Sequence, residues 1–327
     1  MWAQYDVYVT RRLPEPGMSI IEQHCRMEVN PHDRPLTREE LLRAVRGRDG
    51  LVTLLTDRID AEVMDAAGPQ LRVVSNYAVG FNNVDVQEAT RRRIVVTNTP
   101  GVLTETTADL AWALLMAVAR RVVEADAFMR AGKYNGWSPT LFLGTDVYGK
   151  TLGIVGFGRI GQAVARRASG FGMRVLYHDV ARRPGEEEAR LGVAYRPLDE
   201  LLSESDFVTL HVDLNPRTHH LIDARALSLM KPTAFLINTS RGPVVDEAAL
   251  VRALEEGRLA GAGLDVFENE PAMAPGLAKL PNVVVLPHIA SASKETRSRM
   301  AEMAATNLVT ALGGGRPAHV VNPEVLG

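Results

Sequence analysis

Three polar residues follow apolar runs in the second half of the chain: Arg241 in NTSRGPVVDE, Glu270 in DVFENEP and His288 in LPHIAS. An arginine can bind a carboxylate through two parallel hydrogen bonds, and a protonated histidine can donate to a developing alkoxide. These residue types fit the reduction of a 2-oxo acid by a dihydronicotinamide. Arg241 would orient the substrate and polarise its carbonyl group. His288 would be the general acid for reduction, and Glu270 would orient His288 and favour its charged form.

Each of the three residues also has a simpler interpretation. A lone arginine after a strand is usually a surface or ion-pair residue, Glu270 before Pro271 could be a loop acid, and His288 could cap the next helix. Ligands of open α/β sheets bind at the carboxyl ends of the strands. Because all three residues are predicted at such ends, we favour the catalytic interpretation.

A glycine motif, Gly156-Phe-Gly158-Arg-Ile-Gly161, lies between an apolar run and a pattern typical of an amphipathic helix. Gly156 would permit a tight turn, Gly158 would let a pyrophosphate approach the backbone, and Gly161 would let the helix pack closely on the strand. The N-terminus of that helix would favour phosphate. In this context the spacing predicts a dinucleotide-binding βαβ unit, and a purely structural turn is the weaker alternative.

Asp179 follows the second apolar run of this unit, 18 residues after Gly161. It is placed to accept hydrogen bonds from the adenosine ribose hydroxyls, and its charge would repel a 2′-phosphate. We therefore expect NAD(H). Arg182 and Arg183 follow closely and could receive a phosphate, so NADP(H) stays open.

The composition narrows the class of protein. With 327 residues, two domains are expected, and the 37 basic and 39 acidic residues give a net charge of −2, which provides no electrostatic attraction for nucleic acid or an anionic membrane. The single cysteine, Cys25, cannot form an intrachain disulfide, which fits the cytoplasm. The N-terminus lacks the pattern of a secretory signal peptide. The apolar run Leu110 to Ala119 is too short to span a bilayer. We also predict no metal site.

Apolar runs and helical patterns alternate along the chain, which predicts an α/β protein with two Rossmann-like domains built on doubly wound parallel sheets. The helical pattern at 293–314 needs an apolar partner, and the N-terminal domain is the simplest one. We therefore expect a discontinuous substrate-binding domain, 1–100 with 289–327, and a dinucleotide-binding domain, 101–288. Within the latter, an arm at 102–150 carries side chains that we expect to pack on a second subunit: Tyr134, Trp137, Leu141 and Phe142.

The chain resembles the D-isomer-specific 2-hydroxyacid dehydrogenases over nearly its whole length. The matching blocks are YAVGFNNVD (77–85), NTPGVLTETTAD (98–109), GKTLGIVGFGRIGQAVA (149–165), NTSRGPVVDEAAL (238–250), GLDVFENEP (263–271) and LPHIAS (286–291). Residues 77–109 and 131–150 are most similar to the glyoxylate reductase/hydroxypyruvate reductase branch. Asp213, where the family often has proline, and Ala290, where it has glycine, depart from the pattern.

The resemblance implies two domains with a cleft between them, a homodimer formed through the arm, and catalysis by Arg241, Glu270 and His288. It places the substrate carboxylate against the backbone N–H groups of Val79 and Gly80, in a pocket lined by Leu54 and Leu55 and completed by Arg241 and His288. The positions that match cofactor contacts are Thr107, Gly156, Gly158, Arg159, Ile160, Gly161, Asp179, Val180, Ala181, Arg182, Val212, Thr239, Ser240, Arg241, Asp265, His288 and Ser291.

We thus predict reduction of glyoxylate or hydroxypyruvate to glycolate or glycerate. Another 2-hydroxy acid, such as 3-phosphoglycerate, is an alternative. A phosphorylated substrate would need extra cations near 52–56 and 76–83, where Arg58 is the nearest. A non-catalytic NAD(H)-sensing protein on the same scaffold is the alternative from another class, because a fold does not fix a function. The complete Arg–Glu–His set argues against it.

Overall fold

A computed structural model describes residues 5–327 of the chain. Residues 1–4, which the predicted first domain includes, lie outside the described residues. The chain divides into two compact units: one runs to Leu103 and resumes as Ser291–Gly327, and the other is Thr104–Ala290. The boundaries expected from the sequence were 100/101 and 288/289. The two units are described separately.

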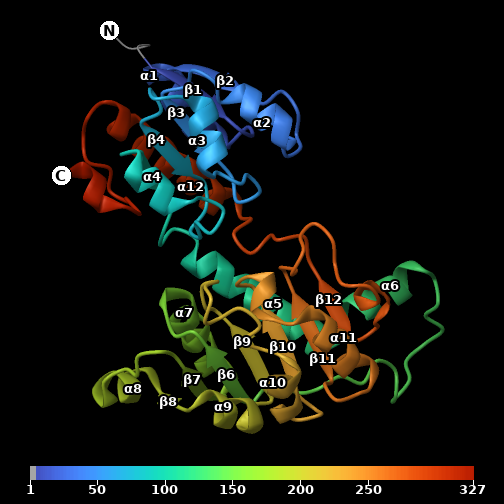
Figure 1. The fold of residues 1–327 in the computed structure, drawn as a ribbon. Helices are drawn as coiled ribbons and strands as arrows, with labels where there is room; N and C mark the ends of the chain where they lie inside the picture. Colours follow the sequence, from blue (N-terminus) through green and yellow to red (C-terminus); the bar gives the residue numbers. More distant parts are fainter. Residues whose placement is uncertain (1–4) are drawn as a thin grey trace. The chain divides into compact units, whose positions relative to one another are not determined.

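The first unit contains a five-stranded parallel sheet in the order β2-β1-β3-β4-β5 (Figure 1). Its strands are β1 Asp6–Val9, β2 Arg26–Val29, β3 Gly50–Thr53, β4 Val73–Asn76 and β5 Val95–Thr97. Its helices are α1 Glu15–His24, α2 Arg38–Ala44, α3 Ala61–Ala67, α4 Val86–Arg91, α12 Lys294–Leu312 and the 3₁₀ turn η4 Pro323–Leu326. Strands β3 and β4 are buried at every residue, as expected of central parallel strands covered by helices on both faces.

Helix α12, although distant in sequence, belongs to the core of the first unit. Met300, Ala304 and Leu308 share an apolar cluster with residues of β1 and α1. Gly17 of α1 allows the close approach of the two helices, because a Cβ at that position would lie 2.7 Å from the Ala301 side chain. The first unit is therefore complete only when the C-terminal segment is in place.

The second unit contains a seven-stranded parallel sheet in the order β12-β11-β10-β9-β6-β7-β8. Its strands are β6 Thr151–Val155, β7 Arg174–His178, β8 Val193–Tyr195, β9 Phe207–Leu210, β10 Phe235–Asn238, β11 Gly261–Leu264 and β12 Val283–Val285. Its helices are α5 Thr104–Ala119, α6 Val122–Arg130, α7 Arg159–Ala168, α8 Gly185–Leu191, α9 Leu198–Glu204, α10 Ala224–Leu229 and α11 Glu247–Glu255, with 3₁₀ turns η1 Ser169–Phe171, η2 Gly242–Val244 and η3 Leu277–Lys279. The two sheets confirm the predicted α/β class.

The strand order of the second unit reverses between β6 and β9. Such a switch point opens a crevice at the carboxyl ends of the strands, where ligands of doubly wound sheets bind. Because all seven strands are parallel, the loops after them lie along the same edge of the sheet. The glycine turn and the three candidate catalytic residues lie at this edge.

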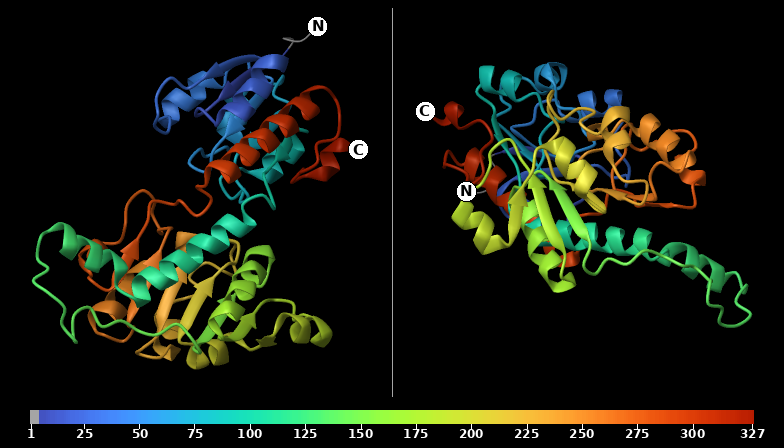
Figure 2. Two further views of the ribbon diagram at one scale, coloured as in Figure 1. Left: turned by 180° about the vertical axis from the view of Figure 1, so that it is seen from behind. Right: turned by 90° about the horizontal axis from the view of Figure 1, so that it is seen from below.

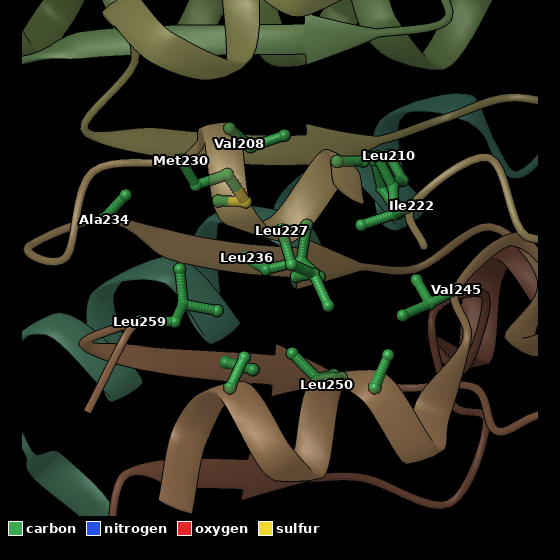
Figure 3. Close-up of a cluster of buried hydrophobic side chains, with 14 of the residues drawn as sticks. Val208, Leu210, Ile222, Leu227, Met230, Ala234, Leu236, Val245, Leu250 and Leu259 are labelled. Carbon is green, nitrogen blue, oxygen red and sulfur yellow. The ribbon is translucent and has the colours of Figure 1, made fainter. Parts of the chain in front are cut away.

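Apolar cores cover both faces of the large sheet. Side chains alternate between them: Leu152 and Ile154 of β6 face the cluster with α5 and α7, whereas Val155 faces the cluster with α10 and α11. Figure 3 shows the latter cluster, in which Leu236 of β10 lies near Leu227 of α10 and above Leu250 of α11. The packed layers on both faces of the sheet keep the strand ends in fixed positions.

The arm begins with α5, whose apolar residues are mostly buried, and continues through α6 into a segment that projects from this unit (Figure 2). Trp137 is 82% exposed and Tyr148 is 78% exposed. Phe142, which we expected to pack on a second subunit, is partly buried and forms a T-shaped pair with Phe128 at 5.2 Å between ring centroids. None of the helices in residues 5–327 is long and apolar enough to cross a membrane.

Candidate active site

The glycine turn after β6 has the geometry that a phosphate site requires. Gly156 has φ +92°, and a Cβ there would lie 2.6 Å from the His211 carbonyl carbon. A Cβ at Gly161 would lie 2.2 Å from the Gly156 carbonyl oxygen, so the backbone of α7 packs directly on the turn. At Gly158 no described atom lies within 4 Å of a Cβ position, which leaves space beside the uncapped N-terminus of α7. The turn fits a pyrophosphate.

Replacing Gly161 by alanine should therefore damage this turn, although alanine favours helices. We expect a loss of about 1–3 kcal/mol of stability from overpacking, together with weaker NADH binding as the turn shifts. Gly170→Ala is the matched control, because a Cβ there meets no described atom within 4 Å. Thermal unfolding and an NADH fluorescence titration measure both effects. Wild-type values for Gly161→Ala would show that the close packing is unimportant.

Asp179, one residue after β7, lies against the glycine turn. Its Oδ2 accepts a hydrogen bond from the Phe157 N–H at 2.7 Å, and its Oδ1 accepts none from residues 5–327. The free oxygen fits a ribose hydroxyl. Val180 and Ala181, the next residues, are both exposed.

The two arginines that could receive a 2′-phosphate already have partners. Arg182 donates from Nε and Nη2 to the Glu188 carboxylate at 2.9 and 3.0 Å. The Nη2 of Arg183 donates to the Phe157 carbonyl oxygen at 3.0 Å. A phosphate would therefore compete with Glu188 for Arg182.

The Asn238 amide shapes the turn that carries Arg241. Its Nδ2 donates to the Arg241 carbonyl oxygen at 3.0 Å, and its Oδ1 accepts from the Ser240 N–H and hydroxyl at 3.0 and 2.9 Å. We did not identify Asn238 from the sequence, although a buried amide at the end of an apolar run is a signal for such a role. The hydroxyl of Thr239 is buried and has no hydrogen-bond partner within the described residues, so it could serve a ligand.

The Arg241 side chain is largely buried, and its Nη1 donates to the Ser240 carbonyl oxygen at 2.7 Å. Burial lowers the pKa of the Arg241 guanidinium, and the nearby charges of Glu270 and Asp213 oppose this effect. An arginine remains charged under these conditions. It is a desolvated cation suited to a carboxylate.

Glu270 and His288 form the hydrogen-bonded pair predicted from the sequence, with 2.9 Å between Glu270 Oε2 and His288 Nδ1. Burial alone would raise the pKa of Glu270, but the hydrogen bond and charge of His288 and the Phe267 N–H lower it below its usual value. The carboxylate is therefore ionised at neutral pH. The other ring nitrogen of His288, Nε2, makes no hydrogen bond within residues 5–327.

Asp265 holds the turn that carries His288. Its two carboxylate oxygens accept from the N–H groups of Ile289 and Ala290, both at 2.7 Å. Burial raises the pKa of Asp265, and these two backbone hydrogen bonds work against the rise. The resemblance placed Asp265 only among cofactor contacts, whereas the structure gives it this backbone contact.

The remaining predicted cofactor positions lie on several different elements of the chain. Thr107 is buried in α5, Val212 is half-buried after β9, Arg159 and Ile160 open α7, and Ser291 begins the returning segment of the first unit. Their roles stay predictions. Next to Val212, His211 was not identified from the sequence. Burial lowers its pKa to about 3, so the ring is neutral.

In the first unit, the loop after β4 presents the backbone of Val79 and Gly80. The Asn98 amide donates to the Val79 carbonyl oxygen at 2.7 Å, and the Asn76 amide donates to the Gly80 carbonyl oxygen at 2.9 Å. The N–H groups of Val79 and Gly80 donate to no acceptor within residues 5–327. Fixed carbonyls with free N–H groups make an anion site.

The loop after β3 is tied to the same region. The Asn83 amide donates to the Leu54 carbonyl oxygen at 3.0 Å and pairs with Asn76 at 3.1 Å. Leu54 is half-buried and Leu55 is 37% exposed. Asparagines thus hold both loops, a role that the NN pair in YAVGFNNVD could have indicated.

Comparisons with known proteins identify the family of the chain. Residues 112–290 match the family model of the D-isomer specific 2-hydroxyacid dehydrogenase NAD binding domain. A glyoxylate reductase of Korarchaeum cryptofilum is 59% identical, covering 98% of this chain and 96% of that protein. The solved TT0316 protein from Thermus thermophilus is 50% identical, with a TM-score of 0.90 and coverage of 97% and 99%. The NADPH-dependent glyoxylate/hydroxypyruvate reductase of Sinorhizobium meliloti, solved with NADP and malonate, is 35% identical, with a TM-score of 0.85 and coverage of 98% and 97%.

Proposed function

The chain belongs to the D-isomer-specific 2-hydroxyacid dehydrogenase family, and we propose that it reduces glyoxylate and hydroxypyruvate to the corresponding hydroxy acids. The observation that carries the proposal is the hydrogen-bonded Glu270–His288 pair, on the same edge of the sheet as Arg241 and the glycine turn. Relatives at 53–59% identity that carry the name glyoxylate reductase support the substrate. We also propose that the enzyme works in the cytoplasm, since its single cysteine is a buried free thiol.

The residues divide the chemistry among them. The nicotinamide cofactor, when bound, supplies the hydride for the carbonyl carbon. Arg241 binds the substrate carboxylate through its planar guanidinium and polarises the carbonyl group. His288 donates the proton of Nε2 to the carbonyl oxygen as negative charge develops there, and Glu270 holds the ring through Nδ1.

The first unit is assigned the other contacts to the substrate. The free N–H groups of Val79 and Gly80 bind a carboxylate oxygen of the substrate. The side chains of Leu54 and Leu55 limit the space for the substituent on the 2-oxo acid. Arg58 is engaged by Asp60 at 3.2 Å, so it offers little to a phosphorylated substrate. This favours small uncharged substituents over 3-phosphoglycerate.

The test follows the oxidation of NADH with glyoxylate, hydroxypyruvate and pyruvate, each repeated with NADPH. We expect turnover with glyoxylate and hydroxypyruvate. Activity only with phosphorylated or larger 2-oxo acids would replace the substrate assignment. Tight NADH binding without turnover of any 2-oxo acid would support the alternative of a dinucleotide sensor.

For the cofactor we propose NAD(H), since the Asp179 carboxylate faces the turn and Arg182 is held by Glu188. Asp179→Ala removes a charged acceptor for the ribose, and hydrogen bonds to charged groups contribute about 1.5–3 kcal/mol. The ratio of kcat/KM with NADH to kcat/KM with NADPH should therefore fall at least about tenfold. Asp146→Ala, at an exposed aspartate in the arm, is the control. A wild-type preference for NADPH, as in the Sinorhizobium meliloti relative, would contradict the assignment.

We further propose that the arm pairs two copies of the chain as a homodimer. The exposed Trp137, Leu143 and Tyr148, at 82%, 65% and 78%, leave an apolar surface that a second subunit would cover. Sedimentation of the wild-type chain distinguishes a dimer from a monomer.

A further inference from the structure

A cluster of side chains outside the assigned catalytic set has the composition of a metal site. Among the described residues, His219, His220 and Glu268 are the only group of three or more histidine, cysteine or acidic residues placed to hold an ion. One ligand atom from each residue lies within 4.8 Å of the others. The histidines follow β9 and the glutamate follows β11, so the cluster joins two loops of the second unit.

The Glu268 carboxylate is held in place by groups behind it. Its Oε1 lies 2.7 Å from His220 Nε2, and its Oε2 accepts from the Glu247 N–H at 3.2 Å. The buried Glu247 carboxylate accepts the Glu268 N–H in return, at 2.8 Å. Metal-binding side chains are characteristically oriented by outer hydrogen bonds of this kind.

The backbone at His220 would suit glycine better than histidine. Its φ is +50°, and its N–H donates to the Pro243 carbonyl oxygen at 2.8 Å. Few non-glycine residues adopt this conformation. The imidazole stacks on that of His219 with 4.1 Å between ring centroids, so the two rings hold each other beside Glu268. The His220 imidazole thus contacts both the His219 ring and the Glu268 carboxylate.

The sequence led us to predict no metal site, but from this cluster we propose that His219, His220 and Glu268 bind a Zn²⁺ ion. Two imidazole nitrogens and one carboxylate oxygen suit zinc, whereas Mg²⁺ and Ca²⁺ prefer oxygen ligands alone. Zinc would take the place of the proton between His220 and Glu268. His219 is exposed, so an ion can enter from solvent and keep a water in the fourth position.

The proposed zinc site adjoins two of the three loops to which we assigned catalysis. A Cβ on Gly242 would lie 1.9 Å from the Phe267 carbonyl oxygen and carbon, so the backbone next to Arg241 packs on the backbone next to Glu268. Glu270 lies two residues beyond Glu268. Zinc would connect the loops after β9 and β11 close to this backbone contact.

The experiment is a calorimetric titration of chelator-treated full-length protein with Zn²⁺, with thermal unfolding measured with and without the ion. We expect one equivalent to bind and to raise the unfolding temperature. His219→Ala and His220→Gly should each weaken binding at least about tenfold. The glycine variant suits the φ of +50° at this position, so loss of binding there reports the side chain and not a broken loop.

Two further variants identify the bound site. His32→Ala removes an exposed histidine in the other unit and should leave zinc affinity unchanged. His288→Asn should also leave it unchanged, which excludes the Glu270–His288 pair as the zinc ligands. Absence of saturable binding to the wild type, or equal affinity in the wild type and the His219→Ala and His220→Gly variants, would overturn the proposal. Because the readout is binding, failure here is distinct from failure of the proposed reductase activity.

Discussion

Replacing His288 by asparagine should lower kcat for glyoxylate reduction by about 10²- to 10⁴-fold, the usual contribution of a positioned general acid. Asparagine cannot deliver a proton to the carbonyl oxygen. It suits the backbone, because His288 has φ +55° and asparagine tolerates this left-handed conformation better than most residues. Its amide can still bond the Glu270 carboxylate. NADH affinity and unfolding temperature should therefore stay close to the wild type.

The control for this variant is His32→Asn, which changes an exposed histidine in the first unit. Its kcat should match the wild type. Stopped-flow measurement of a single turnover separates the chemical step from product release. A wild-type single-turnover rate in His288→Asn would show that another group donates the proton.

Arg241→Gln should reduce kcat/KM by about 10²- to 10⁴-fold, because two charge-assisted hydrogen bonds of about 1.5–3 kcal/mol each are lost. Glutamine has neither the charge nor the two-pronged geometry. Arg241→Lys keeps a charge and should fall between wild type and Arg241→Gln. Since the guanidinium also polarises the carbonyl group, we expect both a higher KM and a lower kcat.

Arg46→Gln, at an exposed arginine of the first unit, controls for the change in net charge. NADH titration checks that Arg241→Gln retains its cofactor site. A rise in KM with an unchanged kcat would restrict Arg241 to substrate binding. Equal kcat/KM in the Lys and wild-type enzymes would contradict the two-pronged contact.

Much of the fold followed from local pattern. The helical pattern noted at 293–314 contains helix α12, Lys294–Leu312, whose apolar residues pack in the core of the first unit. The helix α1 and the edge strand β2 were not predicted. Pro14, Pro16 and Gly17 look like breakers, but Pro16 lies in the first turn of α1 and Gly17 is needed for contact with Ala301. That reason lies almost 300 residues away in the sequence and is invisible to a local pattern.

The candidate site also contains features that the sequence predicted and features that it did not. The Glu270–His288 hydrogen bond follows from two strand ends on one edge of a sheet, so the residue types were enough to predict it. The contacts of Asn238 and Asp265 with backbone groups were not predicted, because any polar residue at a strand end could point elsewhere. The cluster of His220 with Glu268 depends on a contact between the loop after β9 and the loop after β11, which no spacing in the sequence reveals.

The division of the chain also has a consequence for its synthesis. Val7, Met18 and Val73 share their core with Met300, Ala304 and Leu308, which are synthesised only after the whole inserted unit. The inserted unit, Thr104–Ala290, has all its own strands by then and can fold while translation continues. The N-terminal segment must instead wait with its apolar face uncovered. A ribosome stalled before residue 291 would therefore carry a folded second unit and an unfinished first one, exposed to chaperones and proteases.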